Sequence, residues 1–261
     1  MRVSYGIMVA RGDVGIEIPA EKIPAVQKRR VNRCITAHKP VSVATQMLHS
    51  MISNPRPTRA EISDIASAVY QHTDALILSG ETAYGKYPVE AISTMNRVAM
   101  EVERSLSYST DDEAKPYFEN DVTAFLAQQA VTSCHALGTR AILTDSFTGR
   151  TARYISSFRG HYPTLAICYC ENVIRRLALS YGIFPIYQAA RESSRRYLRN
   201  ALQSLMEDGL LSADERIAYL GGGYGEGRGT TFLEINRVGE VLENYASYSL
   251  PNLDAVSQCN A

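Results

Sequence analysis

The chain has 261 residues with 27 basic and 27 acidic side chains, so its formal net charge is zero. This length can bury the core of one large domain or of two ordinary ones. Because the charges balance, no net field favours nucleic acid or an acidic membrane surface, so we expect a small-molecule partner and neither of those two. The five cysteines lack the paired spacing of a zinc site, and reduced thiols without a disulfide framework favour the cytoplasm.

The first hundred residues alternate short apolar runs with longer amphipathic segments. The apolar runs predict three strands, at residues 7–10, 40–45 and 74–78. The amphipathic segments predict three helices, at about residues 19–38, 58–69 and 88–106. Three consecutive strand–helix units predict parallel strands with the helices outside them.

A polar stretch at residues 105–120 contains Pro116 and interrupts the alternation, as is typical of a domain linker. Beyond it we expect helices near residues 121–137, 150–158, 171–181 and 193–208. Strands are expected at residues 140–144, 164–169, 183–187, 216–220 and 231–237. No helix separates the last two strands, so they are expected to pair as a hairpin on a mixed, mostly parallel sheet.

Polar residues follow each of the three N-terminal strands. They are Arg11-Gly12-Asp13, Ala44-Thr45-Gln46 and Ser79-Gly80-Glu81. The carboxyl ends of parallel strands meet at one rim, so we expect these residues to lie together. Asp13 is a hard oxygen ligand suited to magnesium, and Gly12 would let an anion approach the backbone N–H groups. From the triplet alone, a helix-capping role for Asp13 is the simpler interpretation, and Thr45 and Ser79 are equally open to structural roles.

The stretch SGETAYGKY, residues 79–87, nearly matches the phosphate-binding P-loop pattern. Tyr87 stands where that pattern needs a Ser or Thr hydroxyl to hold magnesium, and Pro88 follows it. A P-loop nucleotide phosphatase would rest on this stretch alone, and Tyr87 contradicts it.

Several long segments closely resemble pyruvate kinase. They are IMVARGDVGIEIP, KPVSVATQML, NPRPTRAEISDIASAVYQHTDALILSGETAYGKYPVEA and, beyond the linker, GRTARYIS. The resemblance implies a (β/α)8 TIM-barrel enzyme of glycolysis that transfers the phosphoryl group of phosphoenolpyruvate to ADP, giving pyruvate and ATP. It further implies Mg²⁺ and K⁺ as cofactors, a cytoplasmic location and a homotetramer.

The resemblance begins at the sixth barrel strand and so implies an α/β fold in three parts. Residues 1–106 resemble the C-terminal part of the barrel, residues 107–120 form a linker, and residues 121–261 resemble the C-terminal regulatory domain, with a mixed, mostly parallel sheet. No residue here matches the family's phosphoryl-stabilising lysine, its second magnesium-binding glutamate or its K⁺ site. Because three parallel strands cannot close an eight-stranded barrel, we expect a fragment or truncated product that is inactive or nearly so alone.

Position by position, the resemblance assigns roles at the strand ends. Asp13 matches the magnesium-binding aspartate at the substrate, and Gly12 matches a backbone contact to the substrate carboxylate. Thr45 matches the substrate-binding threonine and, with Ser79, is assigned to catalysis. Ser79 and Glu81 match polar residues near the site, where a hydroxyl and water help to protonate the enolate.

In the C-terminal half, the resemblance points to a loop that holds an effector phosphate in many members of the family. Its matching residues are Thr148, Gly149, Arg150 and Thr151, which offer hydroxyls and helix-start amides. The glycine-rich stretch at residues 221–231, with Arg228, matches the second part of that site, although its glycines can equally serve a turn. An alternative function of another class is therefore a non-catalytic module for binding a phosphorylated effector or for assembly.

Overall fold

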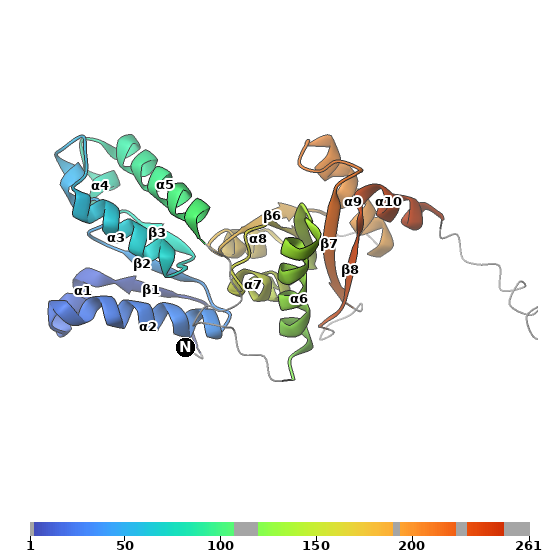
Figure 1. The fold of residues 1–261 in the computed structure, drawn as a ribbon, viewed down its shortest axis with the longest axis horizontal. Helices are drawn as coiled ribbons and strands as arrows, with labels where there is room; N and C mark the ends of the chain where they lie inside the picture. The colour runs from blue at the N-terminus through green and yellow to red at the C-terminus, as the bar shows by residue number, and fades with distance from the viewer. Residues whose placement is uncertain (1–2, 107–119, 190–193, 223–228, 248–261) are drawn as a thin grey trace, which may run out of the picture.

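The computed structural model describes residues 3–106, 120–189, 194–222 and 229–247 and contains two separate β-sheets (Figure 1). The first sheet holds β1 (Ile7–Ala10), β2 (Val41–Ala44) and β3 (Ala75–Ile77). The second holds β4 (Ala141–Ser146), β5 (Thr164–Cys168), β6 (Ile183–Tyr187), β7 (Arg216–Gly222) and β8 (Thr230–Arg237). All eight expected strands are therefore present in the described residues, and the predicted linker falls largely on residues outside them.

The first sheet is parallel throughout, in the order β1-β2-β3, with Val9 opposite Val43 and Val43 opposite Leu76. Three long helices follow its strands: α2 (Ile23–Thr36), α3 (Arg59–Tyr70) and α5 (Pro88–Ser105). The connections from strand to long helix also contain the short helices α1 (Arg11–Glu17) and α4 (Gly80–Ala83) and two 3-10 turns, Ala20–Lys22 and His49–Ile52. This part of the chain is the predicted segment of a (β/α) barrel.

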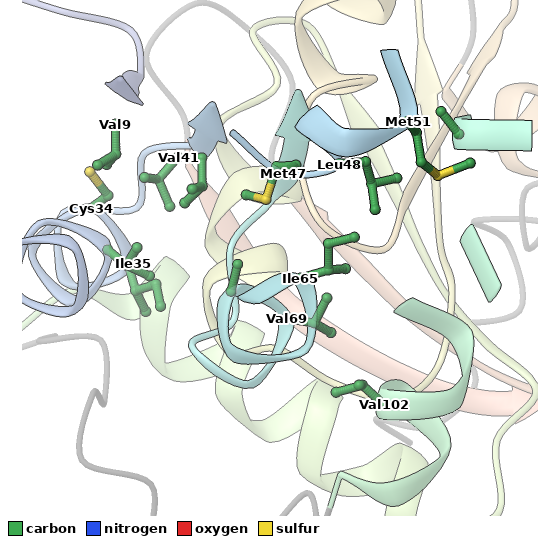
Figure 2. Packing of buried hydrophobic residues seen from close by; sticks show 14 residues of the cluster. Val9, Cys34, Ile35, Val41, Met47, Leu48, Met51, Ile65, Val69 and Val102 are labelled. Atoms are coloured by element: carbon green, nitrogen blue, oxygen red, sulfur yellow. The ribbon is translucent and has the colours of Figure 1, made fainter. Parts of the chain in front are cut away.

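One face of the first sheet is buried beneath its helices (Figure 2). Val9 and Val41 project from the strands toward Cys34 and Ile35 of α2, and all four are almost completely buried. Because side chains alternate along a strand, Met8 lies on the opposite face, where it is 55% exposed. The packed face thus matches the expectation that helices lie on the outside of the strands.

The second sheet has the order β6-β5-β4-β7-β8 and is parallel except for β8, which pairs antiparallel with β7. Buried clusters place α6 (Val122–Leu137), α7 (Arg150–Ser157) and α8 (Glu171–Leu177) on one face. The other face is covered by α9 (Ser194–Glu207) and α10 (Val238–Ser247). The predicted hairpin and mixed sheet are confirmed, whereas α10 was not predicted from the sequence.

Several boundaries differ from the sequence prediction, and two of them have a clear structural reason. Strand β4 continues to Ser146, two residues beyond the expected end, because its register with β5 extends to the pair Ser146 and Cys168. Helix α8 ends at Leu177, four residues early, because the Ser180 N–H bonds to the Leu177 carbonyl in a turn that leads to Gly182 at φ +66°. None of the described helices combines the length and apolar character needed to cross a membrane.

The two sheets are joined at the amino-terminal ends of β2 and β3. Asp74, just before β3, forms a bidentate ion pair with Arg159, with two N···O distances of 2.7 Å. His38, shortly before β2, stacks on Tyr154 of α7 with ring centroids 3.8 Å apart. The joint therefore lies at the end of the strands opposite to the polar residues that follow them.

Candidate active site

The carboxyl ends of β1 and β2 are linked by a direct hydrogen bond. The N–H of Gly12 donates to the hydroxyl of Thr45 at 3.0 Å, across the two neighbouring strands. Ser79 follows β3, and because β3 is parallel to β2, Ser79 lies at the same end of the sheet. Ser79 is exposed there. The structure therefore brings Gly12 and Thr45 together, as expected from parallel strands, with Ser79 beside them along the rim.

Asp13 lies in the first turn of α1, next to Gly12, and its side chain is exposed. A carboxylate in this position interacts favourably with the positive end of the helix dipole. Within the described ranges, no group of three His, Cys, Asp or Glu side chains could hold a metal ion. Mg²⁺ is commonly held by one or two carboxylates together with substrate oxygens and water, so Asp13 fits as one ligand of such an ion.

The backbone that carries Thr45 is strained. Thr45 and Gln46 have φ values of +72° and +55°, a left-handed conformation that is rare for any residue with a side chain and rarest for a β-branched one. Such backbone persists only where its surroundings fix it, and it is enriched at functional sites. This strain gave no signal in the sequence.

Arg11 holds the start of this strained segment. Its guanidinium donates to the backbone carbonyl of Thr45 at 2.6 Å and pairs with Asp64 of α3 at 2.5 Å. The sequence pattern marks Arg11 only as the polar end of a strand, but in the structure it is buried and fixes the residue that carries the rim hydroxyl. A buried arginine with two partners cannot be recognised before the partners are known, because they lie far along the chain.

Glu81 differs from its expected place among the exposed polar residues of the rim. It is only 2% exposed, and its two carboxylate oxygens accept hydrogen bonds from the backbone N–H groups of Leu48 and Ser79, at 3.1 and 2.8 Å. The carboxylate therefore ties the segment after β2 to the segment after β3. Its contacts are with the protein backbone rather than with the open rim.

The P-loop-like stretch adopts no phosphate-binding loop. Its first half forms the short helix α4, and Lys86 donates its backbone N–H to the carbonyl of Ile52 at 2.8 Å. A Cβ atom on Gly85 would lie 2.4 Å from the carbonyl oxygen of Glu81, so this glycine permits a tight turn. Gly85 and Lys86 shape the connection between α4 and α5.

The proposed effector loop connects β4 to α7. Gly149 precedes α7 with φ +76°, and its N–H bonds to the Ser146 hydroxyl at 2.9 Å. Thr151, in the first turn of α7, lies 2.8 Å from Thr230 of β8, hydroxyl to hydroxyl. The loop and the hairpin therefore meet, but Arg228 and the rest of residues 223–228 lie outside the described residues.

Arg150 points toward α6. Its guanidinium lies 3.3 Å from both the Asp121 carboxylate and the Tyr154 hydroxyl. The hydrogen bond with Tyr154 raises the pKa of Arg150. Partial burial opposes ionisation of Asp121, but hydrogen bonds to its carboxylate, with that of Ala124 N–H first, lower its pKa. Arg150 thus already neutralises a carboxylate, which leaves the amides and hydroxyls as the main anion-binding groups of this loop.

The fold and the rim define a class of protein: a (β/α)-barrel segment with polar strand ends, joined to an α/β domain with a mixed sheet. The chain matches the family model for the pyruvate kinase barrel domain over residues 1–92 and that for the pyruvate kinase alpha/beta domain over residues 125–235. Together the two matches cover most of its length. The chain belongs to the pyruvate kinase family.

Individual relatives agree with this assignment. The pyruvate kinase of Borreliella burgdorferi is 39% identical over 245 residues, which are 93% of this chain and 51% of that protein. That of Bacillus licheniformis is 40% identical over 93% of this chain and 42% of its own length. A crystal structure of a pyruvate kinase from Cryptosporidium parvum superposes with a TM-score of 0.82 at 36% identity, covering 90% of this chain and 47% of that one. The chain thus spans about half the length of the relatives it matches.

Proposed function

We propose that this chain is part of a pyruvate kinase, which transfers the phosphoryl group of phosphoenolpyruvate to ADP and yields pyruvate and ATP. The observation that carries the proposal is the contact between the Gly12 amide and the Thr45 hydroxyl, beside the exposed Asp13 carboxylate, in a chain of this family. These groups suit an anionic substrate with a bound metal ion.

In this proposal the rim binds the substrate carboxylate. The Gly12 N–H, which donates to the Thr45 hydroxyl in the structure, and that hydroxyl would each turn to a carboxylate oxygen of phosphoenolpyruvate. Asp13 would hold Mg²⁺, which supplies positive charge to the enolate oxygen as the phosphoryl group leaves. K⁺ belongs to the same proposal, but none of these residues is assigned to it.

The exposed Ser79 hydroxyl and Thr45 would serve the protonation step. Loss of the phosphoryl group leaves the enolate of pyruvate, whose methylene carbon must gain a proton to give the methyl group of pyruvate. A hydroxyl at the end of β3 can orient a water molecule that delivers this proton. Glu81 is too deeply buried to do so directly.

We also propose the domain division at residues 1–106, 107–120 and 121–261, and a cytoplasmic homotetramer. The division is supported by separate buried clusters around the first sheet and around the second. The tetramer and the location rest on family membership.

Ligand binding to the chain tests the proposal. Phosphoenolpyruvate with Mg²⁺ should raise the apparent melting temperature, because a ligand that binds only the folded state stabilises it. Asp13→Asn should abolish the Mg²⁺-dependent part of the shift. Thr45→Val should weaken binding by about 10–100-fold, since it removes a hydrogen bond to a charged group.

Ser63→Ala is the matched control, because this exposed hydroxyl lies on α3 and bonds only to its own helix. Its ligand-induced shift should equal that of the unaltered chain. No shift with phosphoenolpyruvate at any concentration would contradict the proposal. In a coupled assay we expect little ATP from the chain alone, because no residue here has been assigned the role of the phosphoryl-stabilising lysine.

We further propose a second function, binding of a phosphorylated effector at the start of α7. It is supported by Gly149, which directly precedes the backbone N–H groups at the start of α7, and by the hydroxyls of Thr148 and Thr151. A sugar bisphosphate should then raise the melting temperature without Mg²⁺, and Thr148→Ala should reduce the shift. Thr36→Ala, an exposed hydroxyl on α2, is the control. An unchanged melting temperature with sugar mono- and bisphosphates would exclude the effector site.

A further inference from the structure

We infer that Glu81 is the positioning residue of the rim and that it sets the places of both Thr45 and Ser79. The effect of this positioning on catalysis rests on the proposed function. The positioning itself rests on the hydrogen bonds of Glu81 in this chain. Glu81 lies in α4, two residues after Ser79 of the rim. Its carboxylate is buried between the segments that follow β2 and β3.

The segment after β2 is held at both of its ends. Thr45 and Gln46 are both left-handed, so this backbone would relax if its ends were released. Arg11 holds the Thr45 carbonyl at one end. Glu81 Oε1 holds the N–H of Leu48 at the other, and the Leu48 side chain is fully buried. The strained turn that presents the Thr45 hydroxyl is therefore held between two charged side chains.

Ser79 is held by the same carboxylate. The other oxygen of the same carboxylate, Oε2, accepts the Ser79 N–H at 2.8 Å. Ser79 has φ −124° and ψ −100°, outside the regular strand and helix regions, so this bond fixes an irregular link between β3 and α4. One carboxylate thus fixes the backbone of two rim segments whose hydroxyls are assigned to catalysis.

A direct chemical role for Glu81 fits the geometry less well. Both of its oxygens already accept backbone N–H groups, and only 2% of the residue is exposed. A residue that acts through Thr45 and Ser79 should influence the rim without touching the substrate. The exchange rate of the Gly12 N–H measures this indirect influence, because this group bonds to the Thr45 hydroxyl and not to Glu81.

Amide hydrogen exchange of Glu81→Gln tests the inference. The glutamine is isosteric, but its NH₂ group would face one of the two backbone donors. We expect exchange at Leu48, Ser79 and Gly12 to accelerate by at least 10-fold, while the strand amides of Val43 and Leu143 keep their rates. A general loss of stability would instead raise all of these rates together.

Glu61→Gln is the matched control, because Glu61 also accepts a backbone N–H, that of Ser50, from the same connection. Relative to the strand amides of Val43 and Leu143, it should leave the Gly12 rate unchanged. If Glu81→Gln does not fold, Glu81→Asp provides the same test, since the shorter side chain cannot reach both amides. An unchanged Gly12 rate in a folded Glu81 variant overturns the inference.

The phosphoenolpyruvate-dependent thermal shift separates this inference from the proposed function. Loss of the shift in Glu81→Gln, together with faster Gly12 exchange, supports both. Faster Gly12 exchange with an undiminished thermal shift would show that positioning by Glu81 does not matter for the proposed function, and would overturn that part of the inference. If the unaltered chain shows no shift while Gly12 still responds to Glu81→Gln, the proposed function fails and the structural role of Glu81 stands.

Discussion

At the scale of the residue, Asp74 is surrounded by hydrogen-bond donors. Its carboxylate accepts two bonds from Arg159 and one each from the backbone N–H groups of Val41 and Tyr181, all within 2.9 Å. The side chains of Asp74 and Arg159 are 3% and 7% exposed. Removing one member of such a pair leaves the other charged and buried, which costs more than the pair itself contributes.

Asp74→Asn should therefore lower the free energy of unfolding by about 3–5 kcal/mol, as measured by urea denaturation. Glu171→Gln is the control, because Glu171 pairs with Arg175 at 2.8 Å but is 73% exposed. Its loss should be about 0–1 kcal/mol, since solvent screens an exposed pair. Equal losses for the two variants would show that the buried joint contributes no more than a surface ion pair.

At the scale of the element, α3 illustrates how local sequence starts a helix. Thr58 accepts the Glu61 N–H, and the Glu61 carboxylate bonds back to the Thr58 N–H at 2.8 Å, which forms a capping box. Glu61 also accepts the N–H and hydroxyl of Ser50. Partial burial opposes ionisation, but these hydrogen bonds outweigh it and lower the pKa of Glu61.

A lowered pKa in the folded state has a defined consequence for stability. The ionised Glu61 stabilises the fold fully above its unfolded pKa of about 4.3, and this contribution is lost as the pH falls through its lower folded pKa. Glu61→Gln should therefore have a lower melting temperature at pH 7, and the difference should shrink below about pH 4. Glu101→Gln, an exposed change on α5, serves as the control. A difference that does not depend on pH would contradict this reading.

The elements show which parts of the fold can be predicted from the sequence. The eight strands and the long helices up to α9 follow from periodicity, and the hairpin follows from the absence of a helix between β7 and β8. Helix α10 was missed because no break in the sequence separates Val238 from the end of β8 at Arg237. Helix α1 was not among the predicted helices, and two glycines, which disfavour a helix, lie within its seven residues.

At the scale of the whole molecule, the joint and the rim lie at opposite ends of the first sheet. Asp74 and His38 contact Arg159 and Tyr154 before β3 and β2 begin, and Thr45 and Ser79 follow where β2 and β3 end. The elements carrying the rim are therefore anchored at one end and open at the other (Figure 1). This arrangement keeps the carboxyl ends of the strands, where barrel enzymes place their chemistry, accessible.

Sequence patterns alone predict the order of the strands and of the long helices up to α9, the parallel first sheet and the polar residues that end its strands. They can do so because periodicity, capping and turn residues act between neighbours in the chain. The side chains that hold those ends in place can be identified only in the folded chain. Arg11 meets Thr45 across 34 positions, Glu81 meets Leu48 across 33, and Arg159 meets Asp74 across 85. Such contacts depend on how the helices and strands pack, so they cannot be predicted from neighbouring residues in the chain. The stretch SGETAYGKY resembles a phosphate loop in sequence, but in the structure its buried Glu81 ties two segments of the rim together.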